Sequence, residues 1–369
     1  MKKALIAMSG GVDSSVAAYL TMQAGYDCIG CTMRLHGESG LPDDTADARA
    51  VAERLGIPFR VFDLTALFKE KVIGSFVDRY LCGKTPNPCI ECNRHLKFAK
   101  LLEIAAELGC EKLVTGHYAQ VIETPQGFRL KRGADPGKDQ SYVLYMLTAE
   151  QLSHVLLPLG GLTKPEVRAI AEAQDFVTAH KQESQDICFV PDGDYARIVE
   201  RESGVKPVPG DFVDLQGNVL GQHQGLIHYT VGQRRGLGIA VGKPAYVCGL
   251  DVPGNRVVIG DNADLFTDTC KLERMSWTAG DPPKEPLRCT AKIRYRHPAQ
   301  PALLTFTGTD TAILRFDAPQ RAITPGQAAV CYDGDTVLGG GSIAGQPPLA
   351  ILSGRAAPAG DSLRAGSAR

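Results

Sequence analysis

The sequence predicts an α/β N-terminal domain with a Rossmann-like, doubly wound parallel sheet, then a small mainly-β central domain and a C-terminal β-barrel. Three observations carry this prediction. Roughly the first two hundred residues alternate buried strands with helices, which is typical of parallel sheets. After about Val205, short alternating strands are broken by Gly, Pro, Asn and Asp, which is typical of antiparallel sheets. The chain of 369 residues is also too long for one ordinary core.

The N-terminal elements follow from the period of their apolar residues. Apolar runs predict buried strands at 3–8, 27–33, 58–64 and 112–117. Amphipathic stretches that reach a stop glycine predict helices at 13–25, 44–57 and 97–109. In a doubly wound sheet the ligand binds at the carboxyl ends of the strands, so we expect the functional residues there.

The second half of the chain is divided by turn residues. Short alternating runs lie at 210–226, 246–260, 289–297, 301–316 and 327–341. We expect domains over residues 1–204, 205–268 and 269–352. The tail, residues 353–369, is rich in Ala, Gly and Arg and has too little apolar content to pack, so we expect it to be disordered.

Composition places the chain among globular proteins, with 44% apolar and 22% charged residues. No segment approaches the roughly 18 apolar residues of a membrane span, and the apolar run after Lys3 is too short for a signal peptide. We therefore expect a cytoplasmic protein with no membrane partner. The net charge is −1, but residues 128–133 and 288–297 are locally basic and could bind a polyanion.

Eleven cysteines in a reducing compartment are expected to be free thiols, metal ligands or catalytic groups. Those in strand or helix-end contexts are expected to be structural: Cys110, Cys248, Cys270, Cys289 and Cys331. Two C-x-x-C pairs, Cys28 with Cys31 and Cys89 with Cys92, leave a zinc site open as an alternative. Against it, 57 residues separate the pairs, and strand positions three apart face opposite sides.

The segment SGGVDSS, residues 9–15, follows the first strand and opens the first helix. Free N–H groups and the positive end of the helix dipole favour a phosphate at such a turn. The segment is neither a GxxxxGK[ST] loop nor a GxGxxG turn. An acidic Asp13 in a phosphate site is best explained if it helps to hold Mg²⁺. The alternative interpretation is a glycine turn with an Asp or Ser helix cap.

SGGxDS after an N-terminal strand resembles the PP-loop of ATP pyrophosphatases. Further motifs follow at 85–98 (TPNPCIECNRHLKF), 115–118 (TGHY), 138–145 (KDQSYVLY), 184–189 (SQDICF), 230–238 (TVGQRRGLG) and 339–341 (GGG). In this order and spacing the chain resembles the tRNA-specific 2-thiouridylases, the MnmA family, up to about residue 352. The resemblance makes residues 1–204 the catalytic PP-loop domain.

The resemblance implies ATP-dependent 2-thiolation of the wobble uridine, position 34, of the tRNAs for Lys, Glu and Gln. ATP with Mg²⁺ would adenylate the C2 oxygen, and sulfur from a cysteine persulfide would then displace AMP. The enzyme would be a tRNA-uridine 2-sulfurtransferase. Its partners would be tRNA and a cysteine desulfurase or sulfur-relay protein as the persulfide donor.

Cys92 and Cys188 match the catalytic pair of that family. Cys188 would carry the persulfide, and Cys92 would be the nucleophile or would assist sulfide release. The pair must come within disulfide reach at some stage. Asp186 would order the loop of Cys188. Cys89 stands where many relatives have an aspartate that contacts the target base, so that carboxylate is not carried over.

The resemblance also assigns the nucleotide site. The residues that would wrap the phosphates are Ala7, Met8, Ser9, Gly10, Gly11, Val12, Asp13 and Ser14. Met33 would meet the adenine through its backbone, and Gly116 would line the same pocket. No residue is assigned to a resident metal site.

For tRNA, the resemblance assigns His117, Lys138, Asp139, Gln140, Arg294, Tyr295 and Gln327. A wobble base must leave its stack to react, so the protein has to hold the anticodon stem. Without the resemblance, His117 would be interpreted as a hydrogen-bonded structural group and the others as surface side chains. Gln233, Arg234 and Arg235 form a turn whose role is undecided.

Two other functions stay open from the sequence. Another PP-loop enzyme, such as a small-metabolite synthetase, would form AMP without RNA and would need neither Cys92 nor Cys188. A non-catalytic RNA-binding module whose thiols bind zinc would contain stoichiometric zinc and form no AMP.

Overall fold

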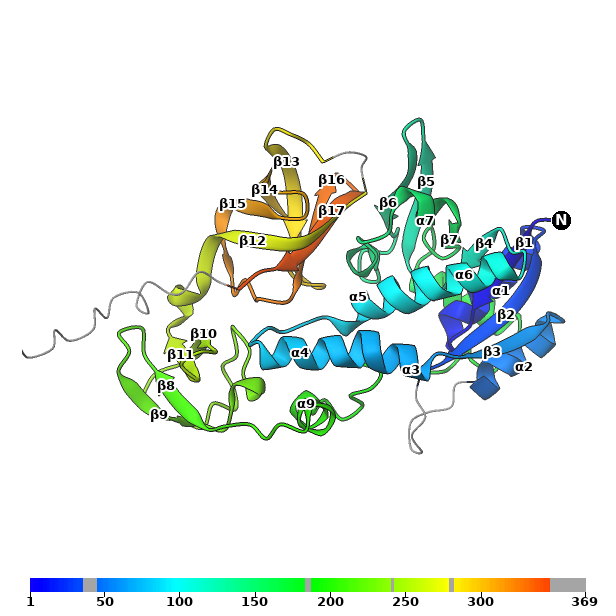
Figure 1. Cartoon of the computed structure of the whole chain (residues 1–369). Coiled ribbons are helices and arrows are strands. Elements are labelled where there is room, and N and C mark those ends of the chain that lie inside the picture. The colour runs from blue at the N-terminus through cyan, green and yellow to red at the C-terminus, as the bar shows by residue number, and fades with distance from the viewer. Residues whose placement is uncertain (36–44, 183–186, 240–241, 279–281, 346–369) are drawn as a thin grey trace, which may run out of the picture.

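A computed structural model describes residues 1–35, 45–182, 187–239, 242–278 and 282–345. The predicted disordered tail and Asp186 lie outside these residues. Figure 1 shows an N-terminal α/β domain, a central β domain and a C-terminal β domain joined by a layer of long helices. The predicted fold class is therefore confirmed.

The N-terminal domain is built on a five-stranded parallel sheet with the strand order β3-β2-β1-β4-β7. Its strands are β1 (Lys3–Ala7), β2 (Asp27–Arg34), β3 (Phe59–Asp63), β4 (Lys112–Val114) and β7 (Val155–Leu156). The first four lie where the apolar runs predicted them. Two crossovers run outward from β1, so the loops after β1 and β4 meet at a switch point where ligands bind in such sheets.

Alternate residues of β1 enter two separate cores, which is why helices cover both faces of the sheet. Ala4 and Ile6 pack in one cluster with residues of α1, α2 and α8, whereas Leu5 packs on the other face with residues of α6 and α7. The helices are α1 (Val12–Gln23), α2 (Thr45–Leu55), α6 (Leu101–Glu107), α7 (Ala149–Ser153) and α8 (Lys164–Ala173).

Two continuous helical rods cross the middle of the molecule (Figure 1). One consists of α3 (Thr65–Phe68), the π-helical η1 (Lys69–Gly74) and α4 (Ser75–Leu81). The other consists of α5 (Pro88–Cys92), the π-helical η2 (Asn93–Lys100) and α6. The helix predicted from residue 97 therefore begins nine residues earlier, at Pro88, with Asn87 as its N-cap. Helix α9 (Tyr195–Ser203) packs against α4 through a stacked pair, Tyr80 and Tyr195.

The central domain is a four-stranded sheet with the order β10-β11-β8-β9. Its elements are β8 (Gly210–Val213), β9 (Val219–His223), η4 (Leu226–His228), β10 (Tyr246–Asp251), β11 (Arg256–Gly260) and η5 (Asn262–Leu265). Phe212, Tyr229 and Val247 lie in its core. A small core of this kind needs support, and the helical rods lie beside it.

The C-terminal domain is a closed barrel, because β12 pairs with β15 on one side and with β17 on the other. Its strands are β12 (Phe266–Trp277), β13 (Leu287–Lys292), β14 (Gln300–Phe306), β15 (Ala312–Arg321), β16 (Ala328–Asp333) and β17 (Thr336–Ile343). Sequence analysis missed the hairpin of β5 (Ala119–Thr124) and β6 (Gly127–Arg132), which extends from the N-terminal domain and pairs with β17.

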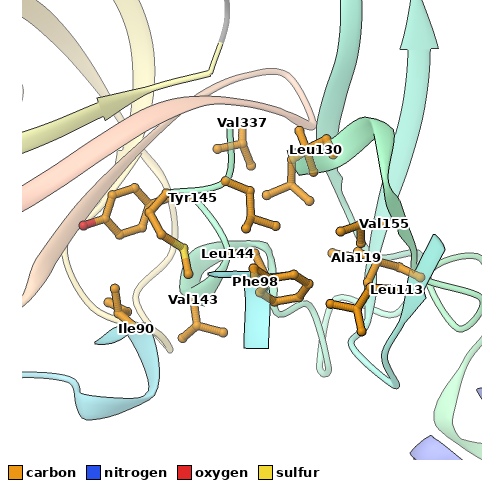
Figure 2. Packing of buried hydrophobic residues seen from close by; sticks show 14 of the residues in the cluster. Ile90, Phe98, Leu113, Ala119, Leu130, Val143, Leu144, Tyr145, Val155 and Val337 are labelled. Carbon is orange, nitrogen blue, oxygen red and sulfur yellow. The ribbon is translucent and has the colours of Figure 1, made fainter. Parts of the chain in front are cut away.

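The barrel shares a core with the N-terminal domain. Figure 2 shows Val337 of β17 above Leu130 of β6, with Leu144 and Phe98 on the N-terminal side. Leu144 follows the short 3-10 turn η3 (Ser141–Val143). Packing of the barrel against this core fixes the position of the barrel relative to the helical rods, because buried apolar contacts resist separation.

Thr85 joins all three domains. Its N–H donates to the carbonyl of Pro325 and its carbonyl accepts from Nε2 of Gln327, each at 2.8 Å, and both residues belong to the barrel. Its hydroxyl lies 3.1 Å from that of Thr230 in the central domain. Gly326 has a φ of +89°, and a Cβ there would lie 2.8 Å from the Thr85 nitrogen. The segment that leads into the Cys92 helix therefore begins at a domain junction.

Candidate active site

The phosphate loop joins β1 to α1. Gly10 has a φ of +69°, a left-handed conformation that glycine adopts without strain. Gly11 is the N-cap of α1 and is extended, with a φ of −106° and a ψ of 163°. The free N–H groups of the first helical turn therefore point out of the helix at the carboxyl end of β1, where the helix dipole favours an anion.

Hydroxyl groups hold the loop in this shape. Oγ of Ser14 accepts from the N–H of Ser9 at 3.1 Å and donates to the carbonyl of Gly11 at 3.0 Å. Oγ of Ser15 donates to the same carbonyl at 2.9 Å and lies 3.0 Å from Oγ1 of Thr178. Ser14 and Ser15 thus organise the loop.

Asp13 is contacted from two distant elements. Oη of Tyr118 donates to its Oδ1 at 2.7 Å, and Nζ of Lys164 lies 2.8 and 2.9 Å from its two carboxylate oxygens. Gly116 lies against the same loop, where a Cβ would come within 2.8 Å of backbone atoms of Asp13 and Ser14. Sequence analysis predicted Asp13 and Gly116 for this site but missed Lys164 and Tyr118.

The other residues predicted to bind the nucleotide lie along the edge of the sheet formed by the carboxyl ends of its strands. Ala7 ends β1 and pairs in register with Cys31 of β2, so Met33, two residues further on, extends past the end of β1. Met33 is half-buried and packs against both the sheet core and the helical rods. Met8 is buried and Ser9 is exposed. The structure therefore brings the predicted phosphate and adenine residues to one edge of the sheet.

Cys92 and Cys188 meet at the helical rods. Cys92 is the last residue of α5, and Cys188 lies in the loop between α8 and α9. That loop is anchored by Phe189, whose ring lies 5.7 Å from that of Phe68 and 5.2 Å from that of Phe76. Cys92 packs against the same apolar cluster, and both thiols are free.

The environment of the thiols favours their protonated form. Loss of hydration raises the pKa of Cys188 to about 12, and the neighbouring Cys92 and Cys89 add to the rise. Desolvation also raises the pKa of Cys92, and the Lys97 ammonium opposes this rise. Lys97 likewise opposes the rise in the pKa of Cys188 and of Cys89. The structure thus groups three thiols around one lysine.

Lys97 belongs to the π-helical segment η2. In a π-helix, hydrogen bonds join residues i and i+5, so side chains five positions apart lie closer to the same face than they do in an α-helix. Lys97 is five positions after Cys92. Sequence analysis predicted an ordinary helix here and did not single out Lys97. A lysine five residues after the predicted catalytic cysteine gives no signal unless the π-helical geometry is known.

A buried carboxylate beside Cys92 ties its helix to the barrel. Glu91 receives a bidentate contact from Arg274 of β12, with distances of 3.0 and 3.2 Å. His95 and Arg79 lie 3.3 and 3.6 Å from the same carboxylate. Arg274 has a φ of +55°, which is strained for a residue other than glycine. The bidentate pair offsets that strain and fixes the barrel against the thiol helix.

Comparison with known proteins covers most of the chain. Three family models match it in succession: a tRNA methyl transferase HUP domain over residues 2–192, a tRNA methyl transferase PRC-barrel domain over 197–261 and an aminomethyltransferase beta-barrel domain over 267–343. The tRNA-specific 2-thiouridylase MnmA of Lachnoclostridium phytofermentans is 47% identical over 356 residues, covering 93% of this chain and 99% of the relative. The chain belongs to the MnmA family of tRNA-specific 2-thiouridylases.

Further relatives agree with this assignment. The MnmA proteins of Clostridioides difficile and Acidithiobacillus ferrooxidans are each 48% identical to this chain. Each alignment covers 93% of this chain, together with 98% of the first relative and 99% of the second. A solved 4-thiouridine synthetase–RNA complex with bound ATP aligns with a TM-score of 0.37 and 20% identity, over 55% of this chain and 50% of that one, which is too distant to bear on the site. Membership of the MnmA family confirms the predicted enzyme class, a tRNA sulfurtransferase, and the use of ATP.

The zinc alternative finds no support in the described residues. No group of three or more His, Cys, Asp or Glu side chains among them could hold a metal ion. Cys28 and Cys31 are buried in β2, away from the exposed Cys89. Within the same residues, no helix is long and apolar enough to cross a membrane.

His117, which the MnmA resemblance assigns to tRNA, is buried. Its Nδ1 lies 2.8 Å from Oγ1 of Thr115, and its ring packs 5.8 Å from that of Phe98. Burial holds the pKa of His117 well below its usual range, and the nearby Lys97 lowers it further. The imidazole is therefore neutral at physiological pH and lies near Lys97.

The loop before η3 carries three more residues that the MnmA resemblance assigns to tRNA. The carboxylate of Asp139 accepts from the N–H groups of Gly133 and Ser141. Oε1 of Gln140 accepts from the N–H of Tyr118 at 3.0 Å. Asp139 and Gln140 thus organise the loop that presents the half-buried Lys138.

The barrel residues assigned to tRNA lie close to this loop. Tyr295 packs edge-on against Tyr142, with ring centroids 6.0 Å apart. Arg294 is half-buried and donates to the carbonyl of Arg321, and desolvation lowers its pKa. The structure therefore brings 138–140 and 294–295 together across the domain interface, whereas Gln327 lies at the separate Thr85 junction.

Proposed function

We propose that this chain thiolates C2 of the wobble uridine, position 34, in the tRNAs for Lys, Glu and Gln. One observation carries the proposal. Met33, at the nucleotide edge of the sheet, packs against the same apolar cluster as Cys92 and Ile187, the neighbour of Cys188. An ATP-activated base and a sulfur-bearing thiol can therefore meet in one site.

The chemistry requires both halves of that site. The C2 oxygen of the uracil attacks the α-phosphorus of ATP, the bond to the β-phosphate oxygen breaks with its electron pair leaving on pyrophosphate, and the N3 proton is lost. The terminal sulfur of a Cys188 persulfide then attacks C2 and expels AMP. Cys92, as thiolate, attacks the Cys188 sulfur, which releases the thiolated base and leaves a Cys92–Cys188 disulfide.

Mg²⁺ fits the residues of the phosphate loop. Mg²⁺ is usually bound by one or two carboxylates together with substrate phosphates, and Asp13 supplies one partly exposed carboxylate. When bound, the ion would neutralise phosphate charge. Tyr118 and Lys164 already contact that carboxylate, so the ion would share Asp13 with them.

The surface around 138–140 and 294–295 is proposed to hold the anticodon stem. Desolvation lowers the pKa of Lys292 in the barrel, and Asp139 of the N-terminal loop opposes this shift, so the Lys292 ammonium lies near that loop. Cationic groups near the phosphates supply affinity, and an aromatic ring such as that of Tyr295 can stack on a base.

The sulfur donor is proposed to be a cysteine desulfurase or a sulfur-relay protein. A persulfide on Cys188 has to be loaded from outside, and Cys188 keeps an exposed surface although neighbouring groups partly desolvate its thiol. All eleven cysteines are free thiols, which suits a reducing compartment, so we propose a cytoplasmic location. The PP-loop domain is proposed to span residues 1–204, with domain limits at 268 and 352.

Nucleoside mass spectrometry tests the proposal. Unmodified tRNA-Glu or tRNA-Lys is incubated with the protein, Mg-ATP and a persulfide donor, and AMP is followed in parallel. We expect 2-thiouridine at position 34, lost in Cys188→Ser. AMP without thiolated RNA would instead support a small-metabolite synthetase. A methylated nucleoside formed with a methyl donor would instead support a tRNA methyl transferase, the activity for which the matching HUP domain is named.

A further inference from the structure

We infer that Lys164 is the phosphate-binding cation of the nucleotide site and contacts the β- and γ-phosphates of ATP, the part that leaves as pyrophosphate. The inference rests on the proposed ATP chemistry and adds a residue to it. The loop at 9–15 contains no lysine. In phosphate loops of the GxxxxGK[ST] kind, a lysine within the loop neutralises these phosphates. Here the fold supplies a lysine from 151 positions away.

The backbone around Lys164 is fixed by three contacts. Thr163 and Glu166 form a capping box at the start of α8, with Glu166 accepting from both the N–H and the hydroxyl of Thr163 at 2.7 Å. The N–H of Lys164 donates to the carboxylate of Asp135 at 3.1 Å. Pro165 follows within the first turn and restricts the backbone further. The backbone of Lys164 is therefore held by its own segment and by Asp135.

The side chain of Lys164 is aimed at the phosphate loop. Only 9% of it is exposed, and its ammonium lies 2.8 and 2.9 Å from the oxygens of Asp13 and 5.7 Å from the ring centroid of Tyr118. Asp13 lies in the first turn of α1, where the free N–H groups await an anion. The ammonium is therefore already beside the place where phosphate oxygens bind.

The ion pair with Asp13 accounts for the resting position of this cation. A buried ammonium is costly without an opposite charge, and Asp13 supplies one while no nucleotide is bound. With Mg-ATP bound, Asp13 would share its carboxylate with the ion, and the Lys164 ammonium would turn to the phosphates. As the C2 oxygen attacks the α-phosphorus, negative charge collects on the departing pyrophosphate, where Lys164 stabilises it.

Lys181 also reaches the loop but has a different part. Its ammonium donates to the carbonyl of Gly10 at 3.1 Å and to Asp47 of α2 at 2.8 Å. A carbonyl contact fixes the backbone of the loop and leaves less of the charge for a ligand. The carboxylate paired with Lys164, Asp13, belongs to the loop itself, whereas Asp47, which pairs with Lys181, lies on α2.

Isothermal titration calorimetry without tRNA tests the inference. ATP with Mg²⁺, pyrophosphate with Mg²⁺ and adenosine are titrated separately into wild type, Lys164→Met and Lys164→Arg. We expect Lys164→Met to weaken ATP and pyrophosphate about tenfold or more, since charge-assisted hydrogen bonds are lost, and to leave adenosine affinity unchanged. Lys164→Arg should recover part of the ATP and pyrophosphate affinity.

Lys112→Met is the matched control. Lys112 is also partly buried and donates to a backbone carbonyl, that of Ser153, but it lies at the amino end of β4, away from the loop. The Lys112→Met variant should bind ATP, pyrophosphate and adenosine as wild type does. ATP and pyrophosphate affinities within twofold of wild type in Lys164→Met would overturn the inference, as would an equal loss for adenosine, which indicates a collapsed site.

The assay separates this inference from the proposed function. If wild type binds Mg-ATP but forms no thiolated tRNA, the proposed thiolation fails, while the ligand pattern of Lys164→Met still decides the role of the lysine. If wild type binds no ATP, both fail. Thermal unfolding of each variant shows whether the loop domain is folded. If Lys164→Met is unfolded, the ATP and pyrophosphate affinities of Lys164→Arg decide the role of the lysine.

Discussion

The phosphate loop and the thiol helix are held in different ways. Contacts to the loop come from its own domain, since Lys164, Tyr118 and Thr178 all belong to the α/β unit. The thiol helix is held from outside as well, through the Glu91–Arg274 pair with the barrel and the Thr85 junction with both β domains.

This difference assigns separate tasks to the two regions. Nucleotide binding depends on one domain that is already assembled. The proposed sulfur transfer would depend on a helix that contacts the barrel, which also carries the proposed tRNA contacts. We therefore expect changes at the loop to alter ATP affinity, and changes at the thiol end to leave ATP affinity intact.

Cys92→Ala should give the largest effect. Thiolation should fall about a thousandfold or more under multiple turnover, as loss of a nucleophile does in other enzymes, because the Cys188 disulfide can no longer form. Mg-ATP affinity, measured by calorimetry, should not change. Cys82→Ala, at an exposed thiol just after α4, is the control and should keep full activity. Residual activity above a tenth of wild type would show that Cys92 is dispensable.

Glu91→Gln tests the attachment of the thiol helix to the barrel. Removal of the buried carboxylate leaves Arg274 and Arg79 without their counter-charge, so the free energy of unfolding should fall by about 3 kcal/mol. Chemical denaturation measures this change. Asp175→Asn, which breaks an exposed pair with Arg54, should cost less than about 0.5 kcal/mol. Equal losses in the two variants would contradict the proposed attachment.

Gly116→Ala tests the close approach at the phosphate loop. Its Cβ would lie 2.8 Å from the backbone of Asp13 and Ser14, so the loop must shift and Mg-ATP affinity should fall about tenfold. Gly161→Ala, where no atom lies within 4 Å of the added Cβ, should bind Mg-ATP as wild type does. Unchanged affinity in Gly116→Ala would show that the loop tolerates displacement.

Lys97→Met should give the smallest effect, and its readout is the reactivity of the thiols. Lys97 lowers the pKa of Cys92 and Cys188 against a larger rise from desolvation, so its removal should raise both pKa values. With a pKa of about 12, the Cys188 thiolate fraction increases about tenfold per pH unit through the neutral range, and alkylation rates should follow it.

At any fixed pH in that range, Lys97→Met should be alkylated roughly threefold more slowly than wild type, since fewer thiolates are present. Mass spectrometry of alkylated peptides measures the rate at each cysteine. Lys100→Met, on the exposed side of the same helix, should react like wild type. Faster alkylation in Lys97→Met would mean that the lysine shields the thiols instead of stabilising their charge.

Much of the architecture is readable from local sequence because it depends on short-range periodicity. The apolar runs at 3–8 and 27–33 became β1 and β2, and the glycine pair at 10–11 became the loop that opens α1. The helix boundaries were less accurate. The rod that begins at Pro88 contains a π-helical segment, and its i to i+5 geometry is set by packing against the rest of the fold.

The sequence by itself determined the order of domains, the phosphate turn and the two cysteines that match the family pair. Only the tertiary structure decided which residues complete them: Lys164 at Asp13, Lys97 beside the thiols and Arg274 on Glu91. The physical reason is distance along the chain. Periodicity reports on neighbours within one element, whereas these contacts depend on strand order and on how the barrel docks against the helical rods.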